Sequence, residues 1–413
     1  MLFFLPQRRH HVSGGWHPWL KRWVVREREA HAWVEVWDRA SGRWLVADPT
    51  PPDGRPDAFR PPGKLRLAFD LVAAGWKRSL AYLRGATGDA RLSIANLKRL
   101  TGGASKEQFT FDLRCPAAAD KRLMLRMDPL ESVVETHRLR EAQILRAMQG
   151  TVPVPEVHWV EADPAALGRP FLIAGFLEGI VQPEGGGRVT GLGMSFEPGL
   201  RAQLRDQFVQ HLAGIHRLDW RRCDLSSYDA PGSGTMEANR WSLGLWERIW
   251  HEDTVQAHPV IEYAASWLKA NMPAVAEPVV VHGDYRSGNF MYTPDGRINA
   301  ILDWELCHLG DYHEDLAYVG CKLLGCPDER GELLACGLLP FEELLARYEE
   351  LSGNPVDRAR LHYYDVFTHY KMASIAATSL RVAHGRKTHL DAMMNLIGGI
   401  GAIAVAVLTD LLD

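Results

Sequence analysis

The sequence predicts an α+β protein in which a small, β-rich lobe precedes a larger, mostly helical lobe. Between residues 90 and 180, short strand-like segments enclose a single helical segment, which is typical of a compact α+β lobe. From residue 200 onward, apolar residues recur mainly at the helical period. A proline-rich stretch at residues 49–63 separates this body from the opening segment.

Length and composition are those of a globular, core-forming protein of two or three domains. The chain has 413 residues, of which 46% are hydrophobic and 24% are charged. Its net charge of −4 argues against general nucleic-acid binding. The charge is uneven, since residues 1–85 hold 15 Lys/Arg and 8 Asp/Glu, whereas the remainder holds 32 and 43. This asymmetry predicts that residues 1–85 form a segment of separate origin.

The cysteine pattern and the two chain ends predict a cytoplasmic protein. The sequence has 6 cysteines, none of them in a CxxC pair, as expected of reduced cytosolic thiols. The apolar start at residues 1–5 is too short for a signal peptide, and basic residues follow it rather than precede it. The apolar run within residues 395–412 is shorter than a membrane span, so we expect a buried helix and no stable membrane insertion. Nothing in the sequence indicates the oligomeric state.

Residues 1–85 are expected to form a β-hairpin, a linker and a helix. Strand-like residues 32–37 and 43–47 flank the loop 38–42, which predicts a hairpin. The proline-rich linker follows, and residues 65–83 have helical periodicity.

The small lobe is expected within residues 86–182. A turn containing Gly102, Gly103 and Ser105 lies between its first two strands, where backbone N–H groups can approach phosphate oxygens. A glycine pair alone is weak evidence, and its place between two strands strengthens it. The expected strands are 94–100, 108–113, 122–127, 156–161 and 170–177, and the expected helix is 131–148.

The large lobe is expected within residues 183–413 and begins with a glycine-rich loop. Residues 278–281 form a short apolar strand inside it, directly before the residues that carry the chemistry. The expected helices are 200–218, 239–251, 259–272, 340–352, 358–383 and 390–412.

Three polar residues at fixed offsets predict a phosphoryl-transfer site. Asp284 follows the strand at 278–281, and Asn289 follows at the Asp-to-Asn offset of the protein kinase catalytic loop. The turn at residues 294–296 predicts a hairpin that returns Asp303 beside Asn289. An amide oxygen and a carboxylate then meet and hold Mg²⁺ against substrate phosphates, while Asp284 takes the proton of an acceptor hydroxyl. Any one of these residues alone is more often a turn cap or a strand end, but the three together favour the site.

Residues of the small lobe are candidates for the nucleotide side of the site. Arg126 ends a strand where a kinase carries its phosphate-binding lysine, and Glu141 on the following helix is its candidate partner. The alternative for both is a surface ion pair of little energetic value. Ala174 and Phe176 lie where the chain leaves the small lobe, and the backbone there is the expected contact for adenine.

Several sequence blocks carry a resemblance to a known family. They are Leu100-Thr-Gly-Gly-Ala-Ser105, Leu125-Arg126, Arg140-Glu141-Ala142, Leu212-Ala-Gly-Ile-His216, His282-Gly-Asp-x-x-x-x-Asn289, and Leu302-Asp-Trp-Glu305 with Gly310-Asp311 and Glu314-Asp315-Leu316-Ala317. Residues from about 90 to 413 thereby resemble the aminoglycoside/choline phosphotransferase family, which has a two-lobed, protein-kinase-like fold. The sequence is most similar to the branch related to kinases associated with acyl-CoA dehydrogenases, which includes hydroxyacyl-CoA kinases.

The resemblance implies a role for each matching residue. Asp284 is then the catalytic base, Asn289 and Asp303 bind Mg²⁺, and Arg126 and Glu141 are the nucleotide-side pair. Arg126 stands where protein kinases use lysine, and an arginine is not a simple substitute for a compact ammonium group. Tyr312-His313 replaces the more usual Asp-Pro after Gly310, so the shape of that loop is not predicted.

The opening segment has a resemblance of its own. Residues 1–50 resemble the C-terminal part of a transglutaminase-like core, through Val12-Ser13-Gly14, the block His31-Ala-Trp-Val-Glu-Val and Asp48-Pro49-Thr50. This resemblance implies that His31 and Asp48 belong to a Cys-His-Asp triad. No cysteine precedes residue 115, so the triad has no nucleophile, and we expect a non-catalytic remnant.

These features together predict an ATP- and Mg²⁺-dependent O-phosphotransferase that acts on a hydroxyl group of a small molecule. Both a hydroxyacyl-CoA and an aminoglycoside-like compound are open as acceptors. The alternatives are a nucleotide-binding protein without transfer activity and, less favoured, a transglutaminase-like cysteine hydrolase.

Overall fold

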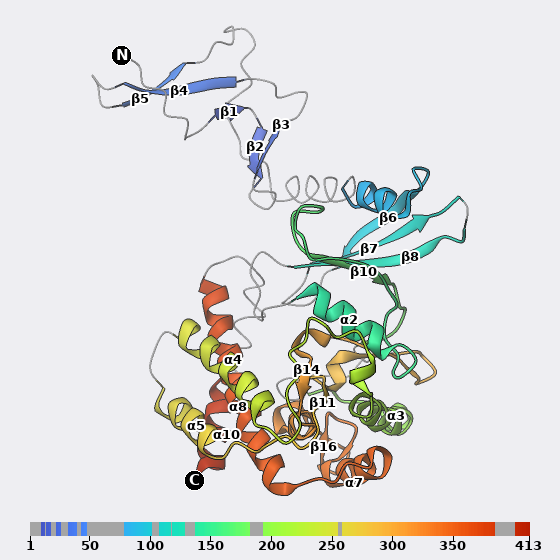
Figure 1. The fold of residues 1–413 in the computed structure, drawn as a ribbon, viewed down its shortest axis with the longest axis vertical. Coiled ribbons are helices and arrows are strands. Elements are labelled where there is room, and N and C mark those ends of the chain that lie inside the picture. The colour runs from blue at the N-terminus through green and yellow to red at the C-terminus, as the bar shows by residue number, and fades with distance from the viewer. Residues whose placement is uncertain are drawn as a thin grey trace. The chain divides into compact units, whose positions relative to one another are not determined.

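In a computed structural model, the chain forms two compact units (Figure 1). Residues 1–92 with 166–168 form the first unit, and residues 93–165 with 169–413 form the second. Before residue 78, only backbone is described. The described residues are 10–12, 14–17, 22–25, 32–38, 43–47, 78–100, 107–116, 118–128, 137–181, 193–254, 258–384 and 401–413.

The first unit contains the predicted hairpin. β4 (Ala32–Asp38) and β5 (Arg43–Ala47) pair antiparallel, with Val34 opposite Ala47. β1 (His10–Val12) pairs with the other edge of β4, and β2 (Gly14–His17) pairs separately with β3 (Arg22–Val25). A helix covers residues 78–87 and so extends past the predicted end at residue 83, while residues 65–77 lie outside the described residues.

The small lobe of the second unit is an antiparallel sheet in the order β6-β7-β8-β10-β9. The strands agree with the predicted segments to within a few residues. Alternating apolar side chains such as Phe109, Phe111, Leu123 and Leu125 are buried, because successive side chains of a strand point to opposite faces. The strands are β6 (Ser93–Leu100), β7 (Glu107–Arg114), β8 (Lys121–Met127), β9 (Val157–Glu161) and β10 (Phe171–Gly175).

One helix, α2 (Arg138–Met148), lies against β9 and β10 and against the short 3-10 helix η5 (Trp304–Leu306). The ring of His137 caps its first turn by accepting the N–H of Arg140 at 3.4 Å. The predicted helix begins at residue 131, and residues 129–136 lie outside the described residues. α2 thus contacts both the sheet and the large lobe.

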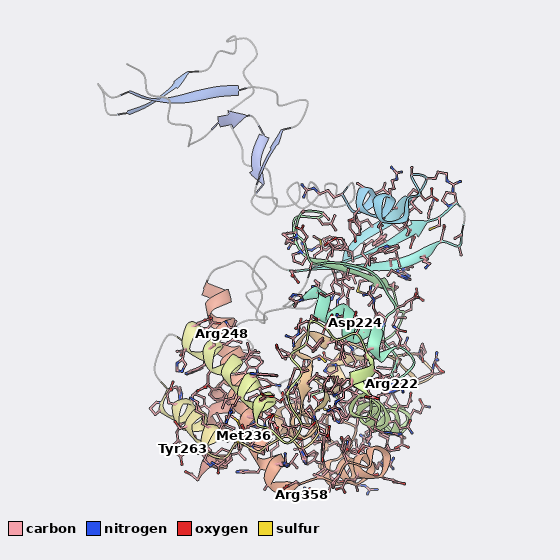
Figure 2. All side chains as sticks on the ribbon, in the orientation of Figure 1. Arg222, Asp224, Met236, Arg248, Tyr263 and Arg358 are labelled. Atoms are coloured by element: carbon pink, nitrogen blue, oxygen red, sulfur yellow. The ribbon has the colours of Figure 1, made fainter. Side chains whose placement is uncertain are left out.

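The large lobe is a group of helices around α8 (Arg358–His384), which contacts α4, α5, α6 and α10 (Figure 1). α3 and α7 form a second pair. Met236 and Tyr263, labelled in Figure 2, are among the exposed apolar side chains of this lobe. The other helices are α3 (Pro198–His216), α4 (Glu237–Asp253), α5 (Pro259–Ala270), α6 (His313–Gly320), α7 (Phe341–Ser352) and α10 (Ala402–Leu412).

Most of these helices agree with the predicted segments, and α6 was not predicted. Its eight residues include Glu314 and Asp315, both buried, so its sequence lacks the apolar stripe of a surface helix. Four short strands of this lobe were also missed: β14 (His308–Gly310), β15 (Cys326–Pro327), β16 (Leu333–Ala335) and β17 (Leu339–Pro340). Within the described parts of the chain, no helix is both long enough and apolar enough to span a membrane.

Two short ribbons carry the site, and one of them, a hairpin, is bonded to residues next to the small lobe. β12 (Phe290–Tyr292) pairs with β13 (Ile298–Ile301), and β11 (Val279–Val281) pairs with β14 (His308–Gly310). Ile180 forms a bridge with Tyr292, and the N–H of Ile301 donates to the Pro153 carbonyl at 2.7 Å. These bonds fix the hairpin against residues that enter and leave the small lobe.

Candidate active site

The candidate catalytic loop begins where β11 ends, beside the start of β14. His282 is fully buried, and its Nδ1 accepts the N–H of Asp284 at 3.2 Å. Because Nδ1 accepts, the proton of the neutral ring lies on Nε2, which is 2.9 Å from the Leu302 carbonyl oxygen. Burial lowers the pKa of His282, which favours this neutral state. The imidazole therefore ties the loop to the end of the hairpin.

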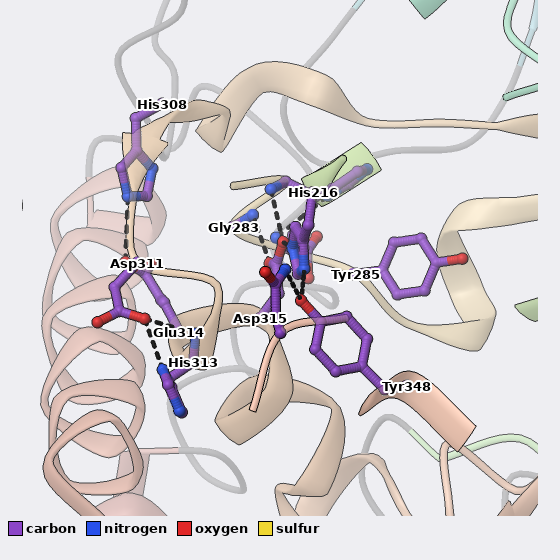
Figure 3. A network of polar contacts seen from close by, with 12 residues as sticks. His216, Gly283, Tyr285, His308, Asp311, His313, Glu314, Asp315 and Tyr348 are labelled. Carbon is purple, nitrogen blue, oxygen red and sulfur yellow. Dashed lines mark hydrogen bonds and ion pairs between the residues drawn. The ribbon is translucent and has the colours of Figure 1, made fainter. Parts of the chain in front are cut away.

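A buried carboxylate fixes the backbone of the same loop (Figure 3). Asp315, on α6, accepts the N–H groups of His282 and Gly283 at 2.7 and 2.8 Å. The Nε2 of His216 lies 3.1 Å from Asp315, and its Nδ1 lies 2.7 Å from the Tyr348 hydroxyl. Burial alone would raise the pKa of Asp315, but His216 and His282 outweigh it and lower the pKa to about 2. Asp315 is therefore an ionised anchor for the loop.

Three side chains surround the carboxylate of Asp284. The Tyr318 hydroxyl donates to Oδ1 at 2.5 Å, and Nε of Arg286 donates to the same oxygen at 3.1 Å. Asn289 donates from Nδ2 to Oδ2 at 2.6 Å. The Asp284 side chain is still 19% exposed. The carboxylate is thus oriented by the protein and accessible to a ligand.

The predicted hairpin brings Asp303 to Asn289. Phe290 lies opposite Ile301, and the N–H of Leu302 donates to the Asn289 carbonyl at 2.7 Å. Asp303 comes next with φ 62° and ψ 54°, a left-handed conformation that turns the chain out of the strand. This conformation is uncommon outside glycine and is enriched at functional sites.

A line of alternating charges runs from Asp303 into the small lobe. Arg126, on β8, lies 3.2 Å from Asp303 through Nη2 and 2.5 Å from Glu141 through Nη1. Glu141, on α2, also pairs with Arg138, whose Nε lies 2.6 Å from Asp128. Arg126, Glu141 and Arg138 are all buried, so their charges compensate one another in place of water. The predicted Arg126–Glu141 pair is present and is not a surface pair; Arg138 and Asp128 were not predicted.

A second group of buried charges lies next to the candidate catalytic loop. Lys371, on α8, donates to the Gly283 carbonyl at 2.8 Å and lies 3.2 Å from Glu314. Nε2 of His308 lies 3.1 Å from the other oxygen of Glu314. Burial opposes both charges, yet Glu314 raises the pKa of His308, and His308 and Lys371 lower the pKa of Glu314. The ammonium also lies 4.9 Å from the ring centre of Tyr318, and so supports the residue that orients Asp284.

The remaining nucleotide-side predictions are only partly placed. Ala174 is buried within β10. Phe176 donates its N–H to the Arg122 carbonyl at 3.0 Å, so this donor belongs to the sheet, and an adenine contact from this segment must use another backbone group. Three predicted residues lie outside the described residues: Gly102, Gly103 and Ser105.

The side-chain oxygens of Asn289 and Asp303 fit a magnesium ion. Because the amide nitrogen of Asn289 is engaged by Asp284, its amide oxygen is the atom left for a cation. The Asp303 side chain is 37% exposed. Mg²⁺ keeps several waters and binds substrate phosphates, so one amide and one carboxylate are sufficient. In the part of the chain that the structure describes, no group of three or more His, Cys, Asp or Glu forms a self-contained metal site.

A cavity of about 630 Å³ lies next to this loop. Its volume is in the range of sites for drug-sized molecules, roughly 300–1,000 Å³. Lys371 and Glu314 line it, which places it beside the Gly283 carbonyl that Lys371 contacts. Trp241 and Leu245, one turn apart on α4, also line it and keep 45% and 37% exposure. The cavity therefore combines charged and aromatic walls near the backbone of Gly283, and Asp284 itself is not one of its lining residues.

Residues 96–360 match the sequence profile of the phosphotransferase enzyme family, APH. The chain belongs to this family. The match includes Arg126, Glu141, Asp284, Asn289 and Asp303, and it confirms that the chain is a phosphotransferase. It begins after residues 1–50, so the transglutaminase-like resemblance gains no support from it.

This phosphotransferase is similar to one part of a much longer relative. It is 27% identical over 307 residues to mouse acyl-CoA dehydrogenase family member 10, an alignment that covers 71% of this chain and 27% of that protein. The alignment thus spans about a quarter of the relative's length.

Solved structures confirm the two-lobed fold. A Ralstonia eutropha protein, provisionally named as an aminoglycoside phosphotransferase, is similar with a TM-score of 0.60 and 24% identity, over 81% of this chain and 98% of that one. The aminoglycoside phosphotransferase APH(4)-Ia, in complex with ADP and hygromycin B, has a TM-score of 0.51 and 16% identity, over 80% and 96% of the two chains. The small β lobe and the helical lobe are therefore those of the aminoglycoside phosphotransferase fold.

Proposed function

We propose that this phosphotransferase transfers the γ-phosphoryl group of ATP, with Mg²⁺, to a hydroxyl group of a small molecule. The observation that carries the proposal is the convergence of Asp284, Asn289 and Asp303. Asn289 joins Asp284 through its side chain and reaches Leu302, the neighbour of Asp303, through its backbone. The ADP bound in the APH(4)-Ia structure supports a nucleotide as the donor.

In this proposal Asp284 binds the acceptor hydroxyl and receives its proton. The bond between the γ-phosphorus and its bridging oxygen breaks, the electron pair leaves with ADP, and the acceptor oxygen forms the new bond to phosphorus. When bound, Mg²⁺ neutralises charge on the phosphate oxygens. Tyr318 and Asn289 hold the two carboxylate oxygens of Asp284, so the base is in place before the acceptor arrives.

Arg126 and Glu141 are proposed to serve the nucleotide. The guanidinium is fixed by Glu141 on one side and reaches Asp303 on the other. Its planar fork suits phosphate oxygens, which lysine would contact only as a point charge. A bound nucleotide therefore meets a cation that is already oriented.

The cavity favours an acceptor with an apolar or flat body over a polycation. Trp241 and Trp246 line it, and such surfaces pack well against hydrocarbon or rings. A polycationic acceptor needs carboxylates that are not already neutralised by the protein. Among the described residues, two of the four acidic lining residues are buried and paired with basic side chains: Glu141 with Arg126, and Glu314 with Lys371. The other two are Glu305 and Asp229, and Asp229 lies 4.0 Å from Arg140. A hydroxyacyl compound therefore fits this cavity better than an aminoglycoside does.

The test is an acceptor screen with Asp284→Asn as its control. With Mg²⁺ and ATP, the wild-type enzyme should phosphorylate at least one hydroxyacyl compound, and chelation of Mg²⁺ should stop the reaction. Asp284→Asn should lower kcat by about 10²-fold or more, as for loss of a general base, with little change in Mg·ADP affinity. If ATP binds but no acceptor gains phosphate, the protein is a nucleotide-binding protein instead.

The proposal includes a cytoplasmic location and a small-molecule partner. All six cysteines are free, and Cys307, Cys321, Cys326 and Cys336 are buried thiols, as expected in a reducing compartment. The net charge of −4 gives no general attraction to nucleic acid.

A further inference from the structure

Arg286 lies beside Asp284 with most of its hydrogen-bond donors unused. Its Nε donates to Oδ1 of Asp284 at 3.1 Å. Among the residues that the structure describes, none accepts a hydrogen bond from either of its Nη atoms. A guanidinium has five N–H donors, so the four on the Nη atoms are available to a ligand.

Other arginines of the same unit are held differently. Arg126 and Arg138 both direct Nη atoms at carboxylates, and Nη1 of Arg360 lies 2.7 Å from Asp311. Structural arginine–carboxylate pairs are frequently bidentate. Arg286 instead uses Nε alone, on an oxygen that it shares with the Tyr318 hydroxyl. A structural ion pair does not account for this arrangement.

The backbone next to Arg286 leaves room for its guanidinium. A Cβ at Gly288 would lie 2.2 Å from Nη1 and 3.0 Å from Cζ of Arg286, so any other residue there would displace the group. The Arg286 side chain is 21% exposed. Burial opposes its charge, but Asp284 and Asp303 raise its pKa, so the guanidinium lies within electrostatic range of both the proposed base and the proposed metal ligand.

We propose that Arg286 is a catalytic residue whose free Nη atoms bind the transferred phosphoryl group as it passes to the acceptor. This inference rests on the proposed function. The acceptor oxygen is hydrogen-bonded to Asp284 when it meets phosphorus, so the phosphoryl oxygens come next to the cation attached to Asp284. Charge on the three equatorial oxygens is the main feature of this transition state, and an arginine supplied within the chain stabilises it.

The role of Arg286 adds no covalent step. The bond from phosphorus to ADP breaks, the bond from phosphorus to the acceptor oxygen forms, and the acceptor proton goes to Asp284. Arg286 stays protonated throughout and contributes charge and hydrogen bonds. Its contribution therefore appears in the transition state and not in the binding of ADP.

The experiment uses the full chain with Mg²⁺, ADP and fluoroaluminate, which together mimic the transferring phosphoryl group without an acceptor. The wild-type enzyme should bind Mg·ADP more tightly when fluoroaluminate is present. Arg286→Ala should lose about tenfold or more of this gain and about 10²-fold in kcat, while its affinity for Mg·ADP alone stays the same. Arg286→Lys should fall between wild type and Arg286→Ala in both measurements, because lysine keeps the positive charge but lacks the planar pair of Nη donors.

A double-mutant cycle separates a direct role from an effect through Asp284. A direct role predicts that Arg286→Ala still weakens fluoroaluminate binding in the Asp284→Asn background, by a smaller factor because the two side chains are in contact. Loss of the effect in that background would make Arg286 a positioning residue and overturn the proposal. Gly288→Ala displaces the guanidinium without removing it, so it should also weaken fluoroaluminate binding and lower kcat. This second variant keeps the proposal testable if Arg286→Ala fails to fold.

Failure of this inference differs from failure of the proposed function. If the wild-type chain turns over ATP and gains affinity from fluoroaluminate, and Arg286→Ala does the same, only the role of Arg286 is wrong. If the wild-type chain binds Mg·ADP but gains nothing from fluoroaluminate and phosphorylates no acceptor, both proposals are wrong.

Discussion

At the scale of one residue, the backbone of the proposed catalytic loop requires a glycine at position 283. Its φ is +79°, and a Cβ there would lie 2.7 Å from the Leu306 carbonyl oxygen. Gly283→Ala should therefore combine about 1–2 kcal/mol for the left-handed backbone with about 1–3 kcal/mol for overpacking against backbone that cannot rotate away. Urea unfolding monitored by circular dichroism measures the loss of unfolding free energy.

Gly353 provides the matched control for this prediction. It ends α7 with φ +75°, and nothing lies within 4 Å of the position of its Cβ. Gly353→Ala should cost only the backbone part, about 1–2 kcal/mol. Equal losses in the two variants would mean that the contact with Leu306 is relieved by a shift of the loop.

Sequence reasoning identified the site residues that have fixed offsets and missed those that have only spatial partners. Asp284 and Asn289 follow a known spacing, and the turn before Asp303 explains its return. Tyr318 and Lys371 reach the loop from α6 and α8, across 34 and 88 residues, and no local pattern encodes such pairings. The one signal for Lys371 was that no other Lys, Arg, Asp or Glu occurs between residues 366 and 380 of its helix.

At the scale of the element, His369 on helix α8 makes the unfolding free energy depend on pH. Burial disfavours the charged form of His369, but Asp365 and the Cys321 thiol outweigh burial and raise the pKa of His369 to about 10. A pKa above the unfolded value means that the stabilisation is complete below pH 6.5 and is lost as pH rises toward 10. The difference in unfolding free energy between wild type and His369→Gln should therefore shrink over this range.

The measurement is a set of urea titrations of both proteins between pH 6.5 and 10. Groups that titrate equally in the two proteins, such as His308, cancel in the difference. Asp365→Asn removes the main hydrogen-bond partner of His369 and should flatten the same pH dependence. A difference that stays constant with pH would show that His369 is neutral in the folded protein.

The sequence revealed long elements better than short ones. The five strands of the small lobe and the helices α3, α4, α5, α7 and α8 have clear periodicity and agree with the expected segments. The short elements β14 and α6 hold the site together, yet their residues are chosen for contacts with the loop and not for an apolar face. Glu314 and Asp315 are buried because the loop and Lys371 neutralise them, and that compensation becomes visible only in three dimensions.

At the scale of the whole molecule, all described residues of the proposed site come from the second unit. The family match begins at residue 96, inside that unit. The order of strands and helices along the chain predicted a small α+β lobe followed by a helical part, and the family resemblance of the motif blocks then implied the two-lobed, kinase-like fold. The acceptor could not be predicted, because the cavity proposed to hold it is assembled from α2, α4, α8 and the segment around η5, which are far apart in the sequence.

The same division predicts that the opening segment is dispensable for catalysis. A chain that begins at residue 78 keeps the helix at residues 78–87 and the entire second unit, including Asp284, Asn289 and Asp303. Its affinity for Mg·ADP and its Mg²⁺-dependent turnover should stay within about threefold of the full chain, because every described residue of the proposed site belongs to the second unit and changes at independent sites have nearly additive effects. Calorimetric titration with Mg·ADP and an ATP-consumption assay make the comparison, with Asp284→Asn in the shortened chain as the inactive control. A shortened chain that remains folded but no longer binds Mg·ADP would show that residues 1–77 contribute to the nucleotide site. Retained binding with lost turnover would instead assign them to the acceptor side.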